Sequence, residues 1–282
     1  MPELPEVETV KETLKQLVLG KTIRDVVIFW PKLIKEPPDS HEFAERLKGQ
    51  TIHNIRRRGK FLCLDLDEEV LVSHLRMEGK YVYFNHRADV TKDAHTHVIF
   101  TFTDGSELHY KDVRKFGTMH VFPKGEEERR LPLVQLGPEP LEERFTAALL
   151  KQRLKNTTRA IKLALLDQTV VVGLGNIYVD EALFRARIHP ETPTDQVSQA
   201  KLNQLVPAIK ETLGEAVEMG GSTVRTYRNG QGRMGMFQQK LAVYGREGEP
   251  CVECGTPIKK IKLGGRGTHF CPNCQKRRKR RA

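Results

Sequence analysis

Hydrophobic residues near the start of the chain recur every three or four positions, which is the spacing of one helix face. These residues are Val7, Val10, Leu14, Leu17 and Val18. Pro5 suits the first turn of such a helix, since an N–H there needs no intrahelical partner, and Gly20 suits its end. The pattern predicts a helix that begins near Pro5 and ends before Gly20.

From residue 21 to 122 the hydrophobic pattern changes to short runs rich in β-branched and aromatic residues. Examples are residues 60–64, 69–72 and 97–102, and turn signals such as Asp104-Gly105 separate the runs. Short strands joined by tight turns are typical of antiparallel sheets. We therefore expect an antiparallel sandwich or barrel behind the N-terminal helix.

A linker and a helical region follow. Residues 136–141 contain two prolines and a glycine, which exclude regular structure. Apolar positions at helical spacing then predict helices over 145–154, 158–166, 177–186 and 199–218. A glycine-rich stretch over 220–235 comes next. The chain is thus expected to belong to the α+β class, with an antiparallel sandwich or barrel domain followed by a helical domain.

Composition and charge restrict the partners of this chain. With 282 residues, 38% of them hydrophobic, it has room for ordinary cores in two domains or in one large domain with an appendage. The net charge of +11 favours a polyanion, above all nucleic acid, and passive nucleic-acid binders share this charge. No apolar run can span a bilayer and the start resembles no signal peptide, so a cytoplasmic protein without a membrane partner is expected. The basic tail, 276–282, is expected to be a solvated arm.

Four of the five cysteines form two C-x-x-C pairs, Cys251 with Cys254 and Cys271 with Cys274. The sixteen residues between the pairs suit two knuckles around one tetrahedral ion. Four thiolates leave no open coordination position, so we expect one structural Zn²⁺ holding a hairpin, and a cytoplasmic setting disfavours disulfides. Cys63 lies alone in an apolar run and is expected to be a buried thiol.

The residues Pro2 and Glu3 suggest covalent chemistry. Once Met1 is removed, Pro2 carries a secondary amine that can form an iminium with a carbon at the aldehyde oxidation level. An α-amino group has a pKa near 8, about two units below that of lysine, so more of it is nucleophilic at pH 7. Glu3 supplies a neighbouring proton donor. The alternative is that Pro2 and Pro5 only mark the helix start.

Three motifs together resemble one family along the whole chain. They are residues 2–9 (PELPEVET), residues 173–181 (GLGNIYVDE) and the four-cysteine finger. In this order they resemble the bacterial formamidopyrimidine-DNA glycosylases, also called 8-oxoguanine DNA glycosylases. The resemblance implies a β-sandwich domain over 1–134, a helix-two-turn-helix domain over 135–237 with a lesion-recognition loop at about 219–237, and a zinc finger over 238–275, followed by the tail.

The resemblance also implies a bifunctional reaction of base-excision repair. Pro2 would attack the anomeric carbon of the damaged nucleotide, while Glu3 would protonate the sugar ring oxygen. Lys60 matches the family residue assigned to β-elimination, and the run Arg56–Lys60 is also expected to face phosphates. Arg266 matches the residue assigned to δ-elimination. Oxidised purines are the implied substrates, and the product is a one-nucleotide gap.

By the same resemblance, other residues are expected to bind DNA. The contacts with the duplex are assigned to His74, Met77, His95, Arg114, Phe116 and Asn176. Met77, Arg114 and Phe116 would fill the gap left by the extruded base. Residue type alone would instead place Met77 and Phe116 in a hydrophobic core, where most such side chains lie. The lesion-recognition loop contributes Ser222, Val224, Arg225, Thr226 and Tyr227. Where relatives carry a lysine cluster this chain has residues 156–159 (NTTR), so Lys155 or Arg159 would replace that phosphate contact.

The expected partner is double-stranded DNA with an oxidised purine opposite cytosine, bound by a monomer. Two alternatives remain open at this point. One is an endonuclease VIII-like glycosylase for oxidised pyrimidines, which would use the same mechanism. The other is a non-enzymatic zinc-finger DNA-binding protein, which explains the charge of +11 but not a proline amine beside Glu3.

Overall fold

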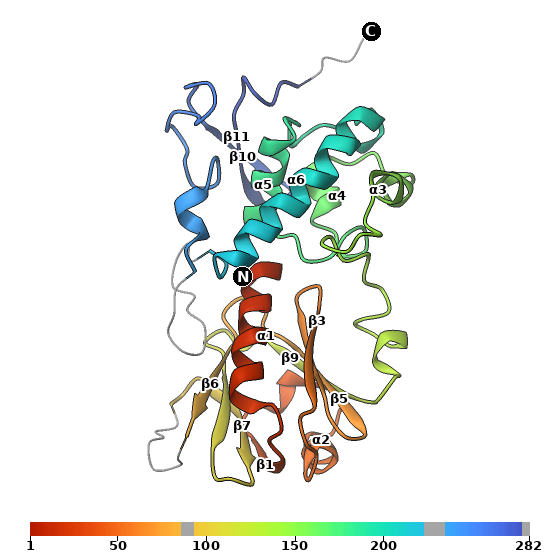
Figure 1. The fold of residues 1–282 in the computed structure, drawn as a ribbon, viewed down its shortest axis with the longest axis vertical. Helices are drawn as coiled ribbons and strands as arrows, with labels where there is room; N and C mark the ends of the chain where they lie inside the picture. Colours follow the sequence, from red (N-terminus) through yellow and green to blue (C-terminus); the bar gives the residue numbers. More distant parts are fainter. Residues whose placement is uncertain (86–92, 223–234, 278–282) are drawn as a thin grey trace. The chain divides into compact units, whose positions relative to one another are not determined.

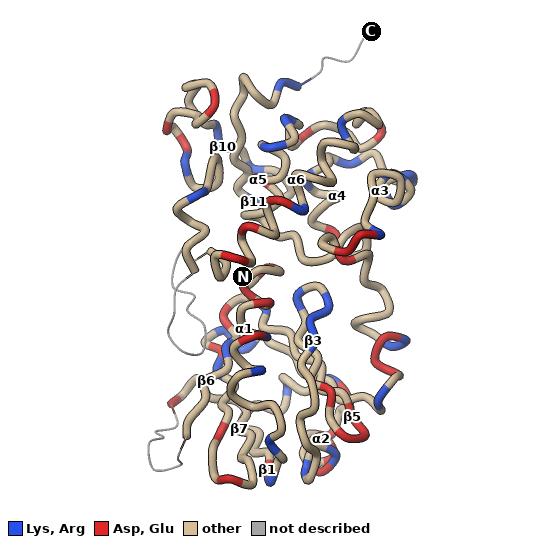
Figure 2. The backbone as a smooth tube through the Cα atoms, in the orientation of Figure 1, with Lys and Arg blue, Asp and Glu red and all other residues tan. Residues whose placement is uncertain are grey.

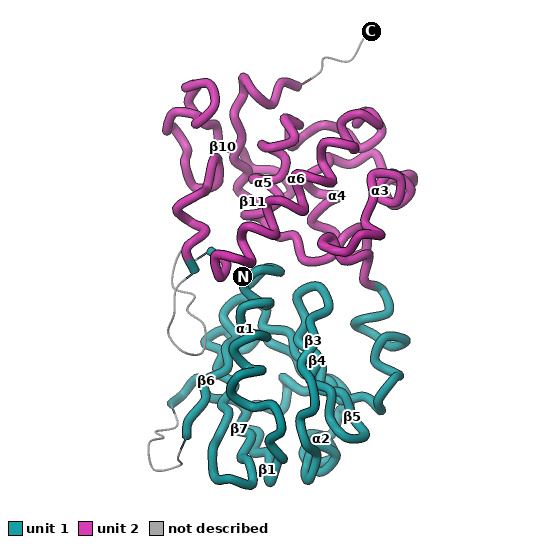
Figure 3. The backbone as a smooth tube through the Cα atoms, in the orientation of Figure 1, with its two compact units in different colours: residues 1–135, 222–235 teal, residues 136–221, 236–282 magenta. Residues whose placement is uncertain are grey.

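The structure is a computed structural model that describes residues 1–85, 93–222 and 235–277. The chain divides into two compact units (Figure 3). Unit 1 comprises residues 1–135 and 222–235, and unit 2 comprises residues 136–221 and 236–282.

Unit 1 begins with the predicted helix, α1 (Leu4–Val18). Its apolar face is buried, with Val7 and Val18 wholly inaccessible to solvent, and the helix ends before Gly20, whose φ is +76°. The helix packs against β3 and β4 (Figure 1). The hydrophobic period therefore predicted both the helix and the face that it buries.

Two sheets form most of the described remainder of unit 1. The four-stranded antiparallel sheet has the order β1 (Ile23–Ile28), β7 (Thr96–Phe102), β8 (Glu107–Lys111), β6 (Lys80–Phe84). The five-stranded sheet has the order β2 (Ile34–Glu36), β9 (Thr118–Pro123), β5 (Glu69–His74), β4 (Phe61–Asp65), β3 (Asn54–Arg58), and only its β2–β9 pair is parallel. Shorter elements are η1 (Pro31–Leu33), α2 (Ser40–Leu47) and η3 (Glu127–Arg129).

One hydrophobic core joins α1 and residues from both sheets, so the architecture is a sandwich and not a closed barrel. Cys63 on β4 is wholly buried, as expected from its apolar run. Burial raises the pKa of its thiol to about 12, which keeps it protonated and unreactive at neutral pH.

Unit 2 contains the predicted helices and a small hairpin. The helices are α3 (Ala147–Leu154), α4 (Ile161–Leu165), α5 (Asn176–Arg185) and α6 (Gln199–Glu218), with η4 (Thr194–Gln196) and η5 (Phe237–Lys240) beside them. The hairpin pairs β10 (Lys259–Leu263) with β11 (Arg266–Phe270). The α+β class is confirmed. Among the described residues no helix is both long and apolar enough to cross a membrane.

Candidate functional site

The start of α1 holds the two residues expected to perform the first chemical steps. Pro2 is buried and Glu3 is 3% exposed. Glu3 is the N-cap of the helix and forms a reciprocal capping box with Glu6, whose Oε2 accepts a hydrogen bond from the Glu3 N–H at 2.8 Å. The positive end of the helix dipole favours carboxylates at this position. Glu3 is thus held in one conformation directly beside Pro2.

Glu6 also bonds to a residue 216 positions away. Its Oε1 accepts a hydrogen bond from the Ser222 N–H at 2.7 Å. Ser222, expected in the lesion-recognition loop, therefore lies at the N-terminal end of α1. The other expected residues of that loop, Val224, Arg225, Thr226 and Tyr227, lie outside the described residues.

Lys60 lies in the tight turn between β3 and β4. Gly59 before it has a φ of +57°, a conformation that suits glycine, and Lys60 itself is 6% exposed. Arg57 links this turn to α1, since its Nη1 donates to the Gly59 carbonyl at 2.9 Å and its Nε donates to Glu8 at 2.7 Å. Burial acts to raise the pKa of Glu8, but hydrogen bonds from Lys11 and Arg57 outweigh it and lower the pKa. The turn carrying Lys60 is therefore anchored to the helix that carries Glu3.

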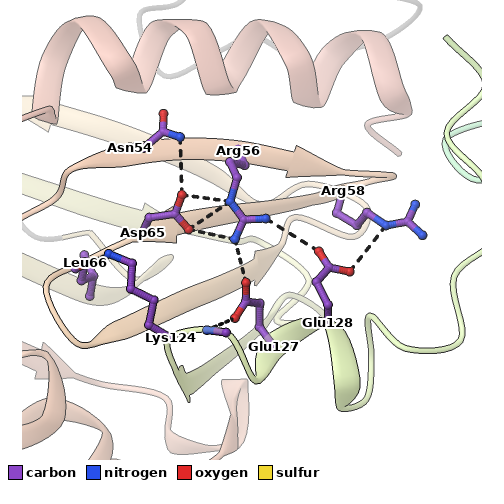
Figure 4. Close-up of polar contacts among 9 residues, drawn as sticks. Asn54, Arg56, Arg58, Asp65, Leu66, Lys124, Glu127 and Glu128 are labelled. Carbon is purple, nitrogen blue, oxygen red and sulfur yellow. Dashed lines mark hydrogen bonds and ion pairs between the residues drawn. The ribbon is translucent and has the colours of Figure 1, made fainter. Parts of the chain in front are cut away.

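Basic residues gather on β3 and the turn after it (Figure 2), and acidic partners hold those on the strand. The Arg56 Nη2 lies 2.8 Å from Asp65 and 2.9 Å from Glu127, and Glu128 lies within 4 Å of both Arg56 and Arg58 (Figure 4). Hydrogen bonding to Asp65 is the main cause that raises the pKa of Arg56. The arginines therefore brace the hairpin that presents Lys60, a role that the sequence did not reveal.

His74, at the end of β5, is held as one tautomer. Its Nδ1 accepts a hydrogen bond from the Arg76 N–H at 2.9 Å, so Nε2 carries the ring proton when the side chain is neutral. Burial, together with the charges of Arg76 and Lys60, lowers the pKa of His74 to about 3. At neutral pH His74 can therefore offer a phosphate one neutral N–H donor.

The lowered pKa of His74 predicts a pH dependence of stability. Between the unfolded pKa of 6.5 and the folded pKa of about 3, the unfolded state binds the proton and the native state does not, so stability falls as the pH falls. Relative to His74→Gln, the free energy of unfolding of the native sequence should decrease by roughly 1.4 kcal/mol per pH unit in this window. Urea titrations from pH 7 to pH 4 measure this difference. Parallel curves for the two proteins would contradict it.

The residues expected to fill the gap in the duplex are exposed on turns of unit 1. Met77 is 37% exposed and Phe116 is 52% exposed, so neither is a core residue. The Arg114 guanidinium lies over the Phe116 ring, 4.7 Å from its centroid. The two side chains therefore support each other as a cation–π pair.

Asp112, which the sequence analysis missed, organises the turn that carries Arg114 and Phe116. It is 1% exposed, and its carboxylate accepts hydrogen bonds from the N–H groups of Arg114, Phe116 and Gly117 at 2.8 to 3.0 Å. Its own N–H donates to the carbonyl of His95, which is exposed. An aspartate often accepts a hydrogen bond from the backbone N–H two residues further on, which stabilises a turn. This sequence signal could have identified Asp112.

Unit 2 carries the remaining candidates. Asn176 is the first residue of α5, and its Nδ2 donates to the Gly267 carbonyl at 2.9 Å. Arg266 is exposed at the start of β11, directly after a Gly264-Gly265 turn in which both φ angles are positive. The helix start and the finger hairpin are thus joined next to Arg266.

The four cysteines of unit 2 form one structural zinc site. Their sulfur atoms all lie within 4.8 Å of one another, and pairs of them are 3.5 and 4.0 Å apart. Zn–S bonds of about 2.3 Å in a tetrahedron place sulfurs about 3.8 Å apart. The separations therefore fit one zinc ion and are too long for a disulfide bond. The one structural zinc expected from the cysteine spacing is thereby confirmed.

Comparison with known proteins places the chain in a family. Models for the formamidopyrimidine-DNA glycosylase N-terminal domain, the formamidopyrimidine-DNA glycosylase H2TH domain and the zinc finger found in FPG and IleRS match residues 1–119, 136–228 and 248–277. Curated formamidopyrimidine-DNA glycosylases of Cytobacillus firmus and Bacillus subtilis are both 62% identical, over 98% of this chain and 100% and 99% of their own length.

Solved structures agree with this assignment. A Lactococcus lactis FPG mutant in complex with Fapy-dG containing DNA is 42% identical with a TM-score of 0.91, and the same organism's Fpg in complex with abasic-site DNA is 41% identical with a TM-score of 0.89. Each comparison covers 98% of this chain and 100% of the other. The fold and the matches define a DNA glycosylase with a zinc finger. The chain belongs to the formamidopyrimidine-DNA glycosylase family, so a bifunctional glycosylase and lyase of base-excision repair is confirmed.

Proposed function

We propose that this protein excises oxidised purines, 8-oxoguanine and formamidopyrimidines, from duplex DNA and then breaks the strand on both sides of the abasic site. The observation that carries the proposal is the Pro2–Glu3 start of α1, with Glu3 fixed by the capping box in a chain of this family. Leu4 followed by residues 5–8 (PEVE) favours the purine branch over the endonuclease VIII-like branch.

The first steps use the residues at the start of α1. The Pro2 nitrogen attacks C1′ of the damaged nucleotide, the base departs with the electrons of the glycosidic bond, and Glu3 protonates the ring oxygen as the sugar opens. The nitrogen then gives up the proton that it carried, which neutralises the departing base, and its recovered lone pair forms the C1′=N⁺ double bond of an iminium as the bond from C1′ to the ring oxygen breaks. The buried carboxyl group of Glu3, aligned by its bond network, would in its protonated form donate the proton that the ring oxygen takes up, and would be left as the carboxylate.

The later steps use two cations. The iminium acidifies the proton on C2′, and its loss expels the 3′ phosphate in β-elimination, where Lys60 at the β3–β4 turn would stabilise the departing charge. A second loss of a proton expels the 5′ phosphate in δ-elimination, for which we assign Arg266 on the finger hairpin. Each step releases one phosphate-terminated DNA end, leaving a one-nucleotide gap.

Base extrusion depends on the exposed side chains of unit 1. An enzyme must rotate the damaged base out of the stack before reacting with it, and filling the vacated space offsets that cost. Phe116 and Met77 would enter the duplex as apolar wedges, and Arg114 would bond to the orphaned base, which we propose is cytosine. The Arg114–Phe116 stacking and the Asp112 bonds support this role, since they hold the wedge ready before DNA arrives.

The phosphate contacts are assigned to neutral donors as well as to cations. His74 through Nε2–H, exposed His95, and Asn176 at the N-terminus of α5 would bind the strand on either side of the lesion. Arg159, already paired with Asp167 at 2.6 Å, or Lys155 would take the place of the relatives' lysine cluster. We also propose that the protein acts as a monomer, because one chain carries all of these residues, and that it acts in the cytoplasm.

The basic tail gives a prediction about salt. Deleting residues 276–282 should make the slope of log affinity against log salt concentration shallower by about 0.9 for each phosphate that the tail neutralises, with excision retained at low salt. Filter-binding titrations of wild type and the truncated protein measure the slope. A control that replaces the tail with glycine and serine separates charge from length. Complete loss of excision at low salt would show instead that the tail is part of the site.

A substrate comparison tests the proposed specificity. The enzyme should release the base from an 8-oxoguanine:cytosine duplex in preference to a dihydrothymine duplex of the same sequence, measured as single-turnover rates. A preference for dihydrothymine would assign the chain to the pyrimidine-specific alternative, contrary to the proposal.

A further inference from the structure

A buried ion pair lies beneath the finger hairpin of unit 2. Lys162 on α4 and Asp180 on α5 have wholly inaccessible side chains, and the Lys162 Nζ lies 2.7 Å from the Asp180 Oδ1. Neither residue takes part in the proposed chemistry. An unpaired charge buried in this way would destabilise the fold strongly, so each residue needs the other as its counter-charge. The other hydrogen bonds of the two side chains show what the pair does in addition.

Further bonds of the pair end on the three residues that follow Arg266. The Lys162 Nζ donates to the Gly267 carbonyl at 3.2 Å and to the Thr268 Oγ1 at 2.9 Å. The Asp180 Oδ2 accepts a hydrogen bond from the His269 N–H at 2.9 Å. More than eighty positions of sequence separate each pair of partners, so these bonds fix strand β11 on the two helices.

Two further contacts hold the same hairpin. The Asn176 Nδ2 also donates to the Gly267 carbonyl, at 2.9 Å. On the other side of Arg266, Gly264 rests against Leu163 so closely that an added Cβ would lie 2.6 Å from the Leu163 Cδ2. The residues on both sides of Arg266 are therefore seated on α4 and α5, while the Arg266 side chain stays exposed.

Stability alone is a poor explanation for this arrangement. Replacing a buried ion pair by apolar residues of similar size is often neutral or stabilising, because desolvation cancels much of the attraction. The feature that an apolar pair could not reproduce is the set of directed bonds to residues 267–269. Such bonds fix where a strand lies, whereas apolar packing allows it to shift.

We infer that Lys162 and Asp180 are positioning residues that act through Arg266, holding the hairpin so that the guanidinium meets the 5′ phosphate during δ-elimination. This inference rests on the role proposed above for Arg266. A displacement of about 1 Å in a catalytic group can lower a rate a hundredfold. Loss of the bonds from Lys162 and Asp180 to the hairpin should therefore slow δ-elimination and leave β-elimination largely unchanged.

The test is the paired apolar variant Lys162→Met/Asp180→Leu, assayed on a duplex with a preformed abasic site. Product lengths on a labelled strand give the ratio of δ- to β-elimination. We expect that ratio to fall about tenfold, against about a hundredfold for Arg266→Ala, while the zinc content stays at one per chain and the melting temperature is maintained. Combining the paired variant with Arg266→Ala should lower the ratio no further than Arg266→Ala alone.

A matched control removes another ion pair of α5, one whose partner lies on α6 and not on the finger hairpin. The Arg185 Nη2 lies 2.7 Å from Glu215 on α6, and Arg185→Leu/Glu215→Leu should leave the product ratio unchanged. If the paired Lys162/Asp180 variant fails to fold or loses zinc, Thr268→Val provides the test. It leaves the ion pair intact and removes the bond from Lys162, together with the bond that the Thr268 Oγ1 donates to the Arg266 carbonyl at 3.3 Å. It should shift the ratio in the same direction by a smaller factor.

The outcomes separate this inference from the proposed function. A shifted ratio in the Lys162/Asp180 variant, absent when Arg266 is already alanine, supports positioning through Arg266. An unchanged ratio of δ- to β-elimination in that folded variant overturns the inference. If Thr268→Val has to be used in its place, an unchanged ratio in Thr268→Val does the same. An unchanged ratio in Arg266→Ala overturns the role of Arg266 itself, and with it the inference that depends on that role.

Discussion

A protein that keeps a residue in front of Pro2 is expected to lose base excision by at least about a thousandfold, because an acylated proline nitrogen is an amide and cannot form an iminium. Insertion of leucine between Met1 and Pro2 would test this by preventing N-terminal trimming to Pro2. Met1 is 45% exposed, so a longer N-terminus has a path to solvent. Single-turnover excision of 8-oxoguanine measures the loss, and mass spectrometry verifies the N-terminus.

The control for this prediction is Pro2→Gly, which restores a free amine once Met1 is removed. It should retain part of the lyase activity on a preformed abasic site, because a primary amine also forms an imine. The extended protein should keep its melting temperature and zinc content. Full excision by a protein shown to retain the extra residue would contradict a nucleophilic role for Pro2.

Loss of the zinc site is the second large effect. Cys271→Ser removes one of four thiolate ligands, and structural zinc contributes about 10–16 kcal/mol of binding free energy to small zinc-dependent folds. We expect loss of zinc, loosening of the finger hairpin, and a decrease in affinity for lesion-containing DNA of at least about a hundredfold. Metal analysis and fluorescence anisotropy with a labelled duplex measure the two effects.

Unit 1 should remain folded in this variant, and the chain offers a probe for it. Trp30, the single tryptophan of the sequence, lies in unit 1, so its fluorescence during urea unfolding reports that unit. The matched control is Cys63→Ala, which removes a buried thiol far from the metal ligands in sequence and should keep both zinc and DNA affinity. Zinc retained at one per chain in Cys271→Ser would contradict the assigned ligand set.

Short-range sequence patterns predicted the elements that depend on residues close together in the chain. The period of apolar residues gave α1 and its buried face, and the cysteine spacing gave the zinc site. Helix α4 shows the limit of this approach. Periodicity predicted a helix over 158–166, but it spans only Ile161–Leu165, because the Ile161 N–H bonds to the Thr192 carbonyl instead of continuing a helical ladder.

The polar networks could not be predicted from spacing. Lys162 meets residues more than a hundred positions away, and Arg56 meets Glu127 across 71 positions. Nothing local distinguishes these side chains from ordinary solvated charges, so only the folded chain shows that they brace the segments bearing Lys60 and Arg266. Met77 and Phe116 present the opposite case, since their residue types favour a core and only the family resemblance predicted their exposure.

The proposed excision reaction requires that Pro2 form the covalent bond to the sugar. The most direct measurement is sodium borohydride trapping on an 8-oxoguanine:cytosine duplex, followed by proteolysis and mass spectrometry of the crosslinked peptide. Reduction of the iminium should leave the sugar attached to the nitrogen of Pro2, on a peptide that begins at that residue and lacks Met1. A crosslink mapped to Lys60 or any other residue, or no crosslink under conditions where the base is released, would contradict the account.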